Sequence, residues 1–527
     1  LKAPTESLVD WREKMDSLFT AADVDALPNQ LVGAAGFDSS EGAGITVLGR
    51  NSNKANEGAF SKFESRIDGF SITGGDVGGG IMVNGYAHEL EISNNHVFGN
   101  SGLFHGGVRI GQPFLELPAE GPFGFNNDLN IHHNSITQNA GLGGAGGGLS
   151  ISTCTDSYTV ANNYVCGNFT IGNGGGIGHL GLSDGGLISN NRIVLNQSFN
   201  QGVAVSGGGL FIGGEPEAGD LTQGSGDVSV DANFIQGNQA GAGHGGGIRT
   251  QFVNGLDIDN PSVENWHTLT FTNNMIVNNV AGWSGAGIAL QDTLRSIIVN
   301  NTIAHNDSTA TVGALIVNNA SEPQPAGISS MPHSDLLEAS IPNNRAEYRG
   351  FSNPTQLVNN VVWRNRAFHY DANLGVAELQ PVLEQTAVGE CIASSNYSEI
   401  GVLGGGTLNP TYSVLTTDTY GGSNNVTDDP ELADTYCNGG RPIASGPGSM
   451  LALPALDEGG NAWIDVRFGP LDVRGDYHIT PGSSAIDTGT RGTPRIAPLL
   501  DFDGEDRPTA GGASAPIDIG ADEVVAE

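Results

Sequence analysis

Acidic and aromatic residues gather in three segments that interrupt an otherwise repetitive sequence, at residues 111–127, 213–226 and 251–267. Carboxylates beside aromatic rings suit carbohydrate, because the rings stack on sugar and a carboxylate pair can act as acid and base. The candidate acid or base groups are Glu215, Asp220, Asp257 and Asp259, and the candidate sugar-binding residues are Phe123, Phe252, Trp266 and Glu264. The same carboxylates could instead hold calcium through oxygen ligands, or simply make exposed loops acidic, and no spacing among them decides.

Histidine and arginine flank two glycine runs in the same way, as His105 and Arg109 and again as His244 and Arg249. Both arginines fall in apolar runs, where an exposed face of a coil would display them. A polysaccharide lyase needs such a base, together with cations that neutralise the acid sugar. The two pairs lie several repeats apart, at least about 15 Å by strand stacking, so they cannot share one reaction centre. A polyuronate lyase is therefore disfavoured.

The C-terminal run DFDGEDRP places Asp501, Asp503 and Asp506 around Gly504, as a calcium-binding loop would. An EF-hand loop also requires a bidentate glutamate at its twelfth position. Gly512 stands at that position here. Calcium is therefore a candidate ligand of these three aspartates, and a purely structural turn is the alternative.

The charge of the chain limits its partners. It carries 57 acidic and 21 basic residues, a formal net charge of −36. Such a field repels nucleic acid and anionic lipid, and it repels polyuronates unless calcium bridges them. It is typical of a soluble exported protein, or of a protein that binds divalent cations. No apolar stretch approaches 18 residues, so we expect no membrane span.

The four cysteines allow three pairings. Cys154 and Cys166 flank one bend, and Cys391 and Cys437 bracket a glycine-rich segment. We expect two local disulfides formed in an oxidising compartment, with four reduced and buried thiols as the alternative. No spacing typical of a zinc site occurs among the cysteines and histidines.

A sequence repeat runs through most of the chain and must position the candidate residues described above. Its marker is a paired asparagine in a short apolar run, followed by a glycine run and a second apolar run. The asparagine that closes this marker is Asn95, Asn134, Asn163, Asn191, Asn233, Asn274 and Asn301, preceded by another asparagine except at Asn134 and Asn233, with successive separations by subtraction of 39, 29, 28, 42, 41 and 27 residues. The base repeat is thus about 28 residues, enough for three short strands and three bends. Stacked turns would lie about 4.8 Å apart, and their buried amides would pair in a continuous ladder.

The glycine runs mark a further bend at which backbone packs closely. A phosphate-binding loop is a poor interpretation of these runs, because no helix of suitable length follows them. The three long repeats arise from the acidic insertions, which occur at the same phase. Insertions at one phase emerge from one side of the coil, often the binding side. The second and third insertions sit in neighbouring turns and are expected to pack together.

The repeat resembles right-handed parallel β-helix proteins, a group that includes pectate-lyase-like enzymes and many bacterial surface proteins. The C-terminal runs YHITPGSSAIDTG, DFDGEDRP and IDIGADE (477–489, 501–508 and 517–523) are similar to the ending of bacterial surface β-helix proteins of the choice-of-anchor type. Together these resemblances cover about residues 67–523. They imply an exported bacterial β-helix, and a cap turn in which Arg507 pairs with a carboxylate, but no single activity.

We therefore predict an all-β fold, a right-handed parallel β-helix with three-strand coils. A helical cap would occupy residues 1–35, the β-helix 36–370, a loop-rich extension 371–480 and an irregular C-terminal cap 481–527. The chain opens with Leu1 rather than Met, so we expect a processed product or a fragment of a longer protein.

Three functions are consistent with this sequence. The preferred one is a non-catalytic extracellular scaffold at a cell surface, in a matrix or in a filament, able to self-associate or to bind polysaccharide or other surface proteins. The alternative is a secreted polysaccharide-degrading enzyme, a glycosidase or a lyase, that uses the acidic loops. The third is a calcium-dependent glycan-binding module without turnover.

Overall fold

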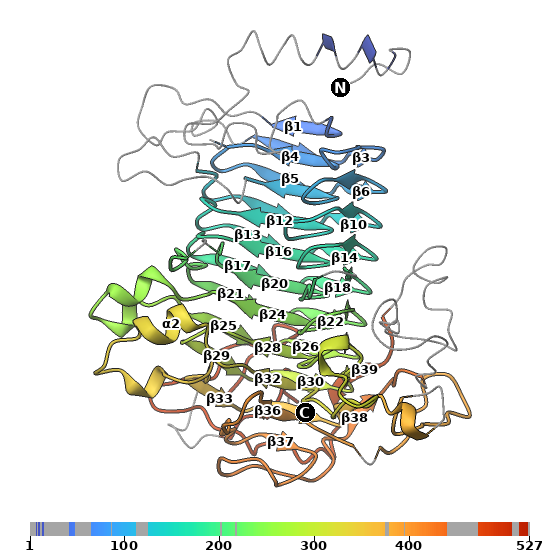
Figure 1. The fold of residues 1–527 in the computed structure, drawn as a ribbon, viewed down its shortest axis with the longest axis vertical. Helices are drawn as coiled ribbons and strands as arrows, with labels where there is room; N and C mark the ends of the chain where they lie inside the picture. Colours follow the sequence, from blue (N-terminus) through green and yellow to red (C-terminus); the bar gives the residue numbers. More distant parts are fainter. Residues whose placement is uncertain are drawn as a thin grey trace.

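Long parallel sheets run side by side along the molecule in a computed structural model of the chain (Figure 1). The structure describes residues 7, 9–10, 13–14, 42–47, 65–85, 87–111, 125–200, 203–216, 219–374, 379–394, 396–439, 473–508 and 516–524. The predicted helical cap over residues 1–35 falls almost entirely outside these ranges. The fold is the expected parallel β-helix.

Four sheets form the walls of the coil, and each complete rung adds one strand to each sheet. Sheet 1 contains β1 (Ile45–Val47), β4 (Ile81–Val83), β8 (Val108–Ile110), β12 (Leu149–Ser152), β16 (Ile177–Leu180), β20 (Leu210–Gly213), β24 (Ile248–Gln251), β28 (Ile288–Leu290), β32 (Ile328–Ser330) and β36 (Ile400–Val402). Sheet 2 contains β2 (Arg66–Asp68), β5 (Glu91–Ser93), β9 (Asn130–His132), β13 (Thr159–Ala161), β17 (Gly186–Ser189), β21 (Val228–Asp231), β25 (Leu269–Thr272), β29 (Ser296–Val299) and β33 (Gln356–Val358).

The other two sheets complete each rung. Sheet 3 contains β3 (Ser71–Ile72), β6 (His96–Phe98), β10 (Ser135–Thr137), β14 (Tyr164–Cys166), β18 (Arg192–Val194), β22 (Phe234–Gln236), β26 (Met275–Val277), β30 (Thr302–Ala304), β34 (Val361–Trp363) and β37 (Val414–Leu415). Sheet 4 contains β7 (Ser101–Gly102), β11 (Ala140–Gly141), β15 (Phe169–Thr170), β19 (Gln197–Ser198), β23 (Gln239–Ala240), β27 (Val280–Ala281), β31 (Asp307–Ser308) and β35 (Arg366–Ala367).

A few elements lie outside these walls. They are the helix α2 (Asp335–Ser340), the 3-10 turns η1 (Leu256–Asp259), η2 (Val263–Asn265), η3 (Gly313–Leu315), η4 (Ala346–Tyr348) and η5 (Ala372–Leu374), and an antiparallel pair of strands, β38 (Leu432–Asp434) and β39 (Asp476–Ile479). Helix therefore contributes little to the described residues.

The interior of the coil is filled by apolar side chains stacked in register. In sheet 2, Ile92, Ile131, Val160, Ile188 and Val230 occupy the same position on successive rungs. All five are fully buried. Strands of three or four residues point one or two side chains inward, so each rung depends on its neighbours to complete the core.

The seven predicted asparagines form a ladder along the interior. Each side-chain oxygen accepts hydrogen bonds from the backbone N–H and the side-chain amide of the asparagine one rung earlier, at 2.9–3.0 Å from Asn95 through to Asn301. The ladder continues to Asn360 and ends where Asn360 N–H donates to the Ser413 hydroxyl at 3.1 Å. The predicted asparagine ladder is confirmed.

A second asparagine ladder lies five residues further along each rung, and it was not predicted. Its members are Asn100, Asn139, Asn168, Asn196, Asn238, Asn279, Asn306 and Asn365. The ladder ends on Glu399, whose carboxylate accepts the Asn365 backbone N–H. The asparagines of this second ladder lie at the bend between sheet 3 and sheet 4. A complete rung therefore has four short strands where three were expected.

The first asparagine of each pair has a different role from the second. Asn94, Asn162, Asn190 and Asn273 have φ between 53° and 56°, in the left-handed region. Asparagine tolerates this conformation better than most residues, and a left-handed residue turns the chain sharply between sheets 2 and 3. The paired asparagine thus combines one bend-forming residue with one ladder residue.

The glycine runs are required by close packing against the second ladder. A Cβ placed on Gly176 would lie 2.7 Å from the carbonyl oxygen of Gly209 and 2.9 Å from the side-chain nitrogen of Asn196. A Cβ on Gly209 would lie 2.7 Å from the Gly247 carbonyl oxygen. No larger residue fits at these positions, which confirms that the backbone packs closely at this bend.

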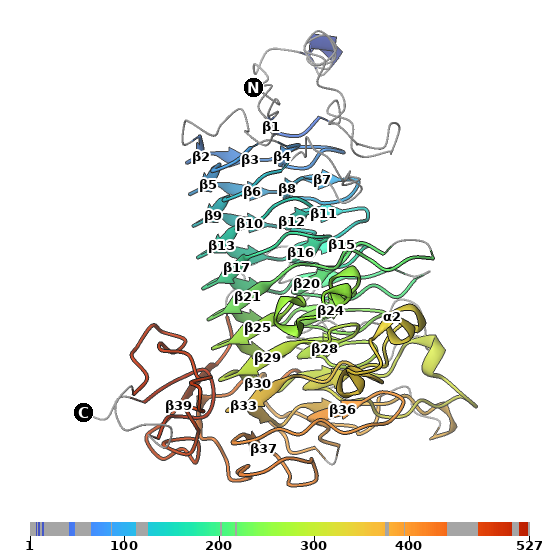
Figure 2. The same cartoon turned by 90° about the vertical axis from the view of Figure 1, so that its left-hand side faces the viewer.

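The C-terminal segment lies against the side of the coil rather than under its end (Figure 2). Tyr477, Ile479 and Ile519 pack on the outward side chains of sheet 3, among them Met275 and Val361. The last rungs are extended by β36 and β37, and Val414 forms a bridge with Val426 beyond them. The coil therefore continues beyond residue 370.

Candidate functional site

The second and third acidic insertions pack together in a projection that we call the side lobe, defined as the described residues of 214–226, 251–267 and 331–352. Figure 1 shows this lobe on the left, in green and yellow, with α2 on its surface. Its apolar centre consists of Ile258, Trp266, Leu337 and Ile341, which pack together with Leu294 of the coil. The segment 331–352, which brings α2, was not identified as part of this side from the sequence.

Trp266 is the central support of the side lobe. Its indole is 1% exposed, its Nε1–H donates to the Asn260 carbonyl at 2.9 Å, and its ring meets the edge of Tyr348 at a centroid distance of 5.2 Å. A ring stacks on sugar only if one face is open, so Trp266 cannot be the binding platform expected from the sequence. Of the other aromatic candidates, Phe252 is half-buried and Phe123 lies outside the described residues.

The carboxylates of the side lobe have unequal roles. Asp257 accepts hydrogen bonds from the Asn254 amide at 2.7 Å, Gly255 N–H at 2.6 Å and His267 N–H at 2.9 Å, so it closes the base of its own loop. Asp259 and Glu264 are exposed, and Glu264 accepts the Ser262 hydroxyl, which lowers the pKa of Glu264.

The side lobe also forms a hollow. The hollow has a volume of about 470 Å³ and is lined by Gly219, Asp220, Leu221, Leu256, Leu336 and Ser340. Asp220 supplies its carboxylate, while Leu256 and Leu336 are 43% and 45% exposed. Glu215, the remaining candidate from this insertion, is half-buried and does not line the hollow. The hollow thus combines one carboxylate with apolar surface.

Arg249 and His244 lie apart from the hollow, and both are packed into the structure. Arg249 is 2% exposed, with one nitrogen 2.9 Å from the Met331 sulfur and another on the Gln291 side chain. Burial lowers the pKa of Arg249 to about 9. His244 stacks on Trp283 with a centroid distance of 4.5 Å, and burial holds its pKa well below the usual range.

The expectation that Arg249 and Arg109 are displayed on an open face of the coil is wrong. Arg109 is 1% exposed and donates to the Gly111 carbonyl at 2.9 Å. The glycine bends explain the burial, because they fold back over the outer side of sheet 1. A Cβ on Gly245, for example, would lie 2.9 Å from the Cβ of Arg249. Residues that alternate outward on this sheet are therefore covered by backbone.

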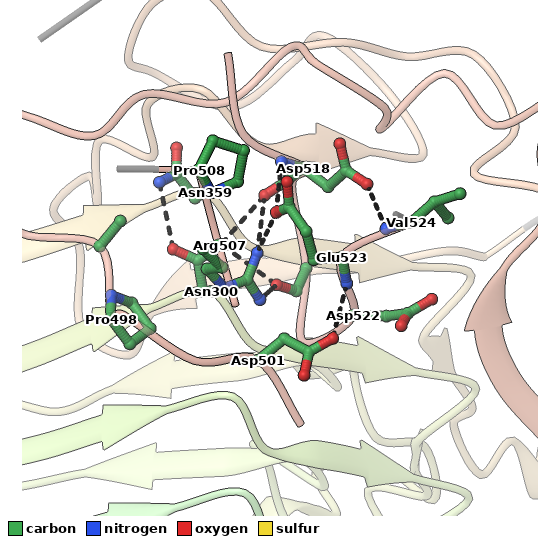
Figure 3. Close-up of polar contacts among 12 residues, drawn as sticks. Asn300, Asn359, Pro498, Asp501, Arg507, Pro508, Asp518, Asp522, Glu523 and Val524 are labelled. Atoms are coloured by element: carbon green, nitrogen blue, oxygen red, sulfur yellow. Dashed lines mark hydrogen bonds and ion pairs between the residues drawn. The ribbon is translucent and has the colours of Figure 1, made fainter. Parts of the chain in front are cut away.

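The C-terminal aspartates lie in a hydrogen-bonded turn around a buried arginine (Figure 3). Arg507 donates to Glu523 at 2.8 Å and to the carbonyls of Gly520 and Ala521, each at 2.9 Å. Burial raises the pKa of Glu523 to about 7, although the guanidinium opposes this. The pairing of Arg507 with a carboxylate agrees with the cap turn implied by the resemblance.

The three candidate calcium ligands of this turn diverge. Asp501 is buried, and its oxygens accept the N–H groups of Asp503 at 3.0 Å, Glu505 at 2.8 Å and Glu523 at 3.1 Å. Asp503 lies 2.9 Å from a ring nitrogen of His478, and Asp506 is exposed. These contacts favour a structural turn over a calcium loop, because the Asp501 oxygens are already used.

One of the two expected disulfides is present. Cys391 and Cys437 are bonded, with a Cα–Cα distance of 4.9 Å. Cys154 and Cys166 are free and buried, so their expected disulfide is wrong. Within a coil, residues twelve positions apart lie on different walls, here at the bend after sheet 1 and on sheet 3. Burial raises the pKa of both thiols to about 12, which makes them unreactive.

Comparisons of the chain with protein-family models, with curated proteins and with solved structures found no match. Among the described residues, no helix is long and apolar enough to cross a membrane.

Proposed function

We propose that this chain is a non-catalytic exported β-helix, a structural or display protein whose rigid coil presents the side lobe to a partner at a surface or in a matrix. The supporting observation is what the sequence-predicted site residues do. Asp257 closes a loop through three hydrogen bonds, and Trp266 is the buried centre of the lobe. Residues expected to perform chemistry instead hold the projection in shape.

The hollow in the side lobe suits contact better than hydrolysis. A glycosidase places two carboxyl groups about 5–10 Å apart across the scissile bond. Asp220 is the one carboxylate among the described residues that line the hollow, and leucines cover much of the remainder. The alternative, a secreted polysaccharide-degrading enzyme, would have to recruit a second acid from outside this lining.

Three features support export to an oxidising compartment as part of the same proposal. The disulfide between Cys391 and Cys437 is typical of secreted proteins. The net charge of −36 favours solubility. The C-terminal runs resemble those of bacterial surface β-helix proteins of the choice-of-anchor type, and we infer that this chain is one of them.

The test is a polysaccharide screen of the full chain, with reducing ends and unsaturated sugars as the two readouts. We expect no product above the background of a heat-denatured sample. Asp220→Asn removes the charge that lines the hollow, and Asp506→Asn is the matched control on the C-terminal turn. Product formation that is lost in Asp220→Asn and kept in Asp506→Asn would overturn the scaffold proposal and establish the enzyme.

A further inference from the structure

A column of acceptor side chains runs along the bend that leads into sheet 2. One side-chain oxygen of each member accepts the backbone N–H of the next rung: Asn127 from Asp156 at 3.2 Å, Asp156 from Asp184 at 2.8 Å, Asp184 from Asp227 at 2.8 Å, and Asp227 from Thr268 at 2.7 Å. These bonds fix each carboxylate at rung spacing. In the described part of the chain, the second oxygen of Asp184 and of Asp227 accepts no hydrogen bond.

His267 lies next to the end of this column, one residue before Thr268, at the foot of the side lobe. Its backbone N–H donates to Asp257 at 2.9 Å, and its ring lies against Gly224, where a Cβ would come within 2.5 Å of the imidazole. Its Nε2 lies 3.2 Å from the Gln223 carbonyl oxygen. A carbonyl oxygen only accepts hydrogen bonds, so Nε2 carries the proton in this contact and Nδ1 keeps its lone pair. Metal-binding histidines are commonly held in this way.

A carboxylate oxygen of Asp184, one of Asp227 and a ring nitrogen of His267 all lie within 4.8 Å of one another. From this juxtaposition we propose that Asp184, Asp227 and His267 bind a divalent transition-metal ion of the zinc class. Tetrahedral zinc holds its ligand atoms about 3.3 Å apart, as follows from bonds of about 2.0 Å. Asp184 and Asp227 are exposed and His267 is half-buried, and each carboxylate can turn about the oxygen that accepts its backbone N–H, so we expect a bound ion to draw the three ligand atoms to that separation. Solvent would complete the coordination.

The donor set selects the ion. Calcium prefers six or more oxygen ligands, whereas two carboxylates and one imidazole suit zinc and its neighbours. The ion would fasten the side lobe to the coil, because Asp184 precedes β17 and Asp227 precedes β21, while His267 ends the third insertion. The chain would thus use a metal to position the surface that it presents.

Two other clusters are weaker candidates. His478 lies among Asp476, Asp503 and Asp522, but its two ring nitrogens already lie 2.5 Å from Asp476 and 2.9 Å from Asp503. His305 lies beside Cys391 and Cys437, whose sulfurs are joined in the disulfide. The proposed site differs from both because, among the residues that the structure describes, no cation forms an ion pair with Asp184 or Asp227.

The inference goes beyond the proposed function and does not depend on it. The test is calorimetric titration of the metal-free full chain with zinc chloride and, separately, with calcium chloride. We expect one zinc ion per chain at this site. Asp227→Asn keeps the oxygen that accepts Thr268 N–H, so the fold is retained while a charged ligand is lost. This variant and His267→Gln should each weaken zinc binding at least tenfold.

Two control variants make the result decisive. Asp259→Asn removes an exposed lobe carboxylate, and His478→Gln removes the histidine of the competing cluster; both should bind zinc within twofold of the unmodified chain. Zinc should also raise the midpoint of thermal unfolding of the unmodified chain and not that of Asp227→Asn. No zinc binding, zinc binding lost only in His478→Gln, or calcium bound in place of zinc would each overturn the proposal.

Discussion

Replacement of Asn191 by alanine tests the first asparagine ladder at its centre. The Asn191 side chain is buried, and its oxygen accepts the Asn163 backbone N–H at 2.9 Å and the Asn163 amide at 3.0 Å. Its own amide donates to the Val160 carbonyl at 2.8 Å and to Asn233 at 3.0 Å. Alanine removes all four bonds. At least the Asn163 N–H is left buried without its partner, and the Val160 carbonyl loses a donor.

The magnitude follows from these groups. Each buried polar group left without a partner costs about 1–3 kcal/mol, so Asn191→Ala should lower the free energy of unfolding by about 4 kcal/mol. The measurement is guanidinium-induced unfolding followed by circular dichroism in the β-sheet region. Asn190→Gly is the matched control: Asn190 is exposed with φ of 54°, which glycine also adopts, so its loss should be within about 0.5 kcal/mol. A loss below about 1 kcal/mol for Asn191→Ala, or equal losses for both variants, would refute the reasoning.

Three further predictions concern other buried groups. Burial raises the pKa of Glu399 from 4.5 to about 7, so the folded chain binds this proton more tightly than the unfolded chain does. The folded state should therefore lose about 3 kcal/mol of stability as the pH rises from 4.5 to 7. Glu399→Gln should flatten that part of the curve of stability against pH, and an unchanged curve would contradict the assignment to Glu399. Trp266→Ala should cost about 3–5 kcal/mol in the side lobe and open it to limited proteolysis before the coil, and cleavage in the coil first would contradict this. Arg507→Met leaves Glu523 buried without its partner and should lower the free energy of unfolding by about 3–5 kcal/mol. Arg507→Met combined with Glu523→Leu should recover much of this loss. No recovery in the double variant would contradict a stabilising ion pair between Arg507 and Glu523.

The stacking of the chain could be predicted because the signal was periodic. The second asparagine of each pair marks a buried position on every rung, and its spacing gave the ladder directly. The second ladder carried a comparable signal, since Asn100, Asn139 and Asn168 each follow the first ladder by five residues. It was missed because a single asparagine after glycine or glutamine is less conspicuous than a pair.

The side lobe and the cysteines show where periodicity fails. The packing of the second and third insertions follows from their shared phase, but the Pro- and Ser-rich segment that carries α2 interrupts the repeat, and its place on the same side depends on tertiary contacts. Cys154 and Cys166 are close in sequence yet lie on different walls. Which insertion aromatic is buried was also beyond prediction, because Trp266 is selected by its contacts with Leu337 and Tyr348, from a segment distant in sequence.

The proposed metal ligands have no local motif. Asp184, Asp227 and His267 come from three repeats of unequal length, and only the register of β17, β21 and β25 brings them together. A sequence search for metal-binding spacings therefore overlooks them.

The central claim is that rungs far apart in sequence stack at strand spacing, and one distance tests it most directly. Arg66 on β2 and Ser229 on β21 occupy the same position on strands five steps apart in sheet 2. With spin labels on Arg66→Cys and Ser229→Cys, pulsed electron paramagnetic resonance should give a single narrow distribution of label-to-label distances. We expect it to be centred near 24 Å, which is about five strand spacings of about 4.8 Å. The native Cys154 and Cys166 are buried and should not react with the label. A broad distribution, or one centred beyond about 40 Å, would contradict the account.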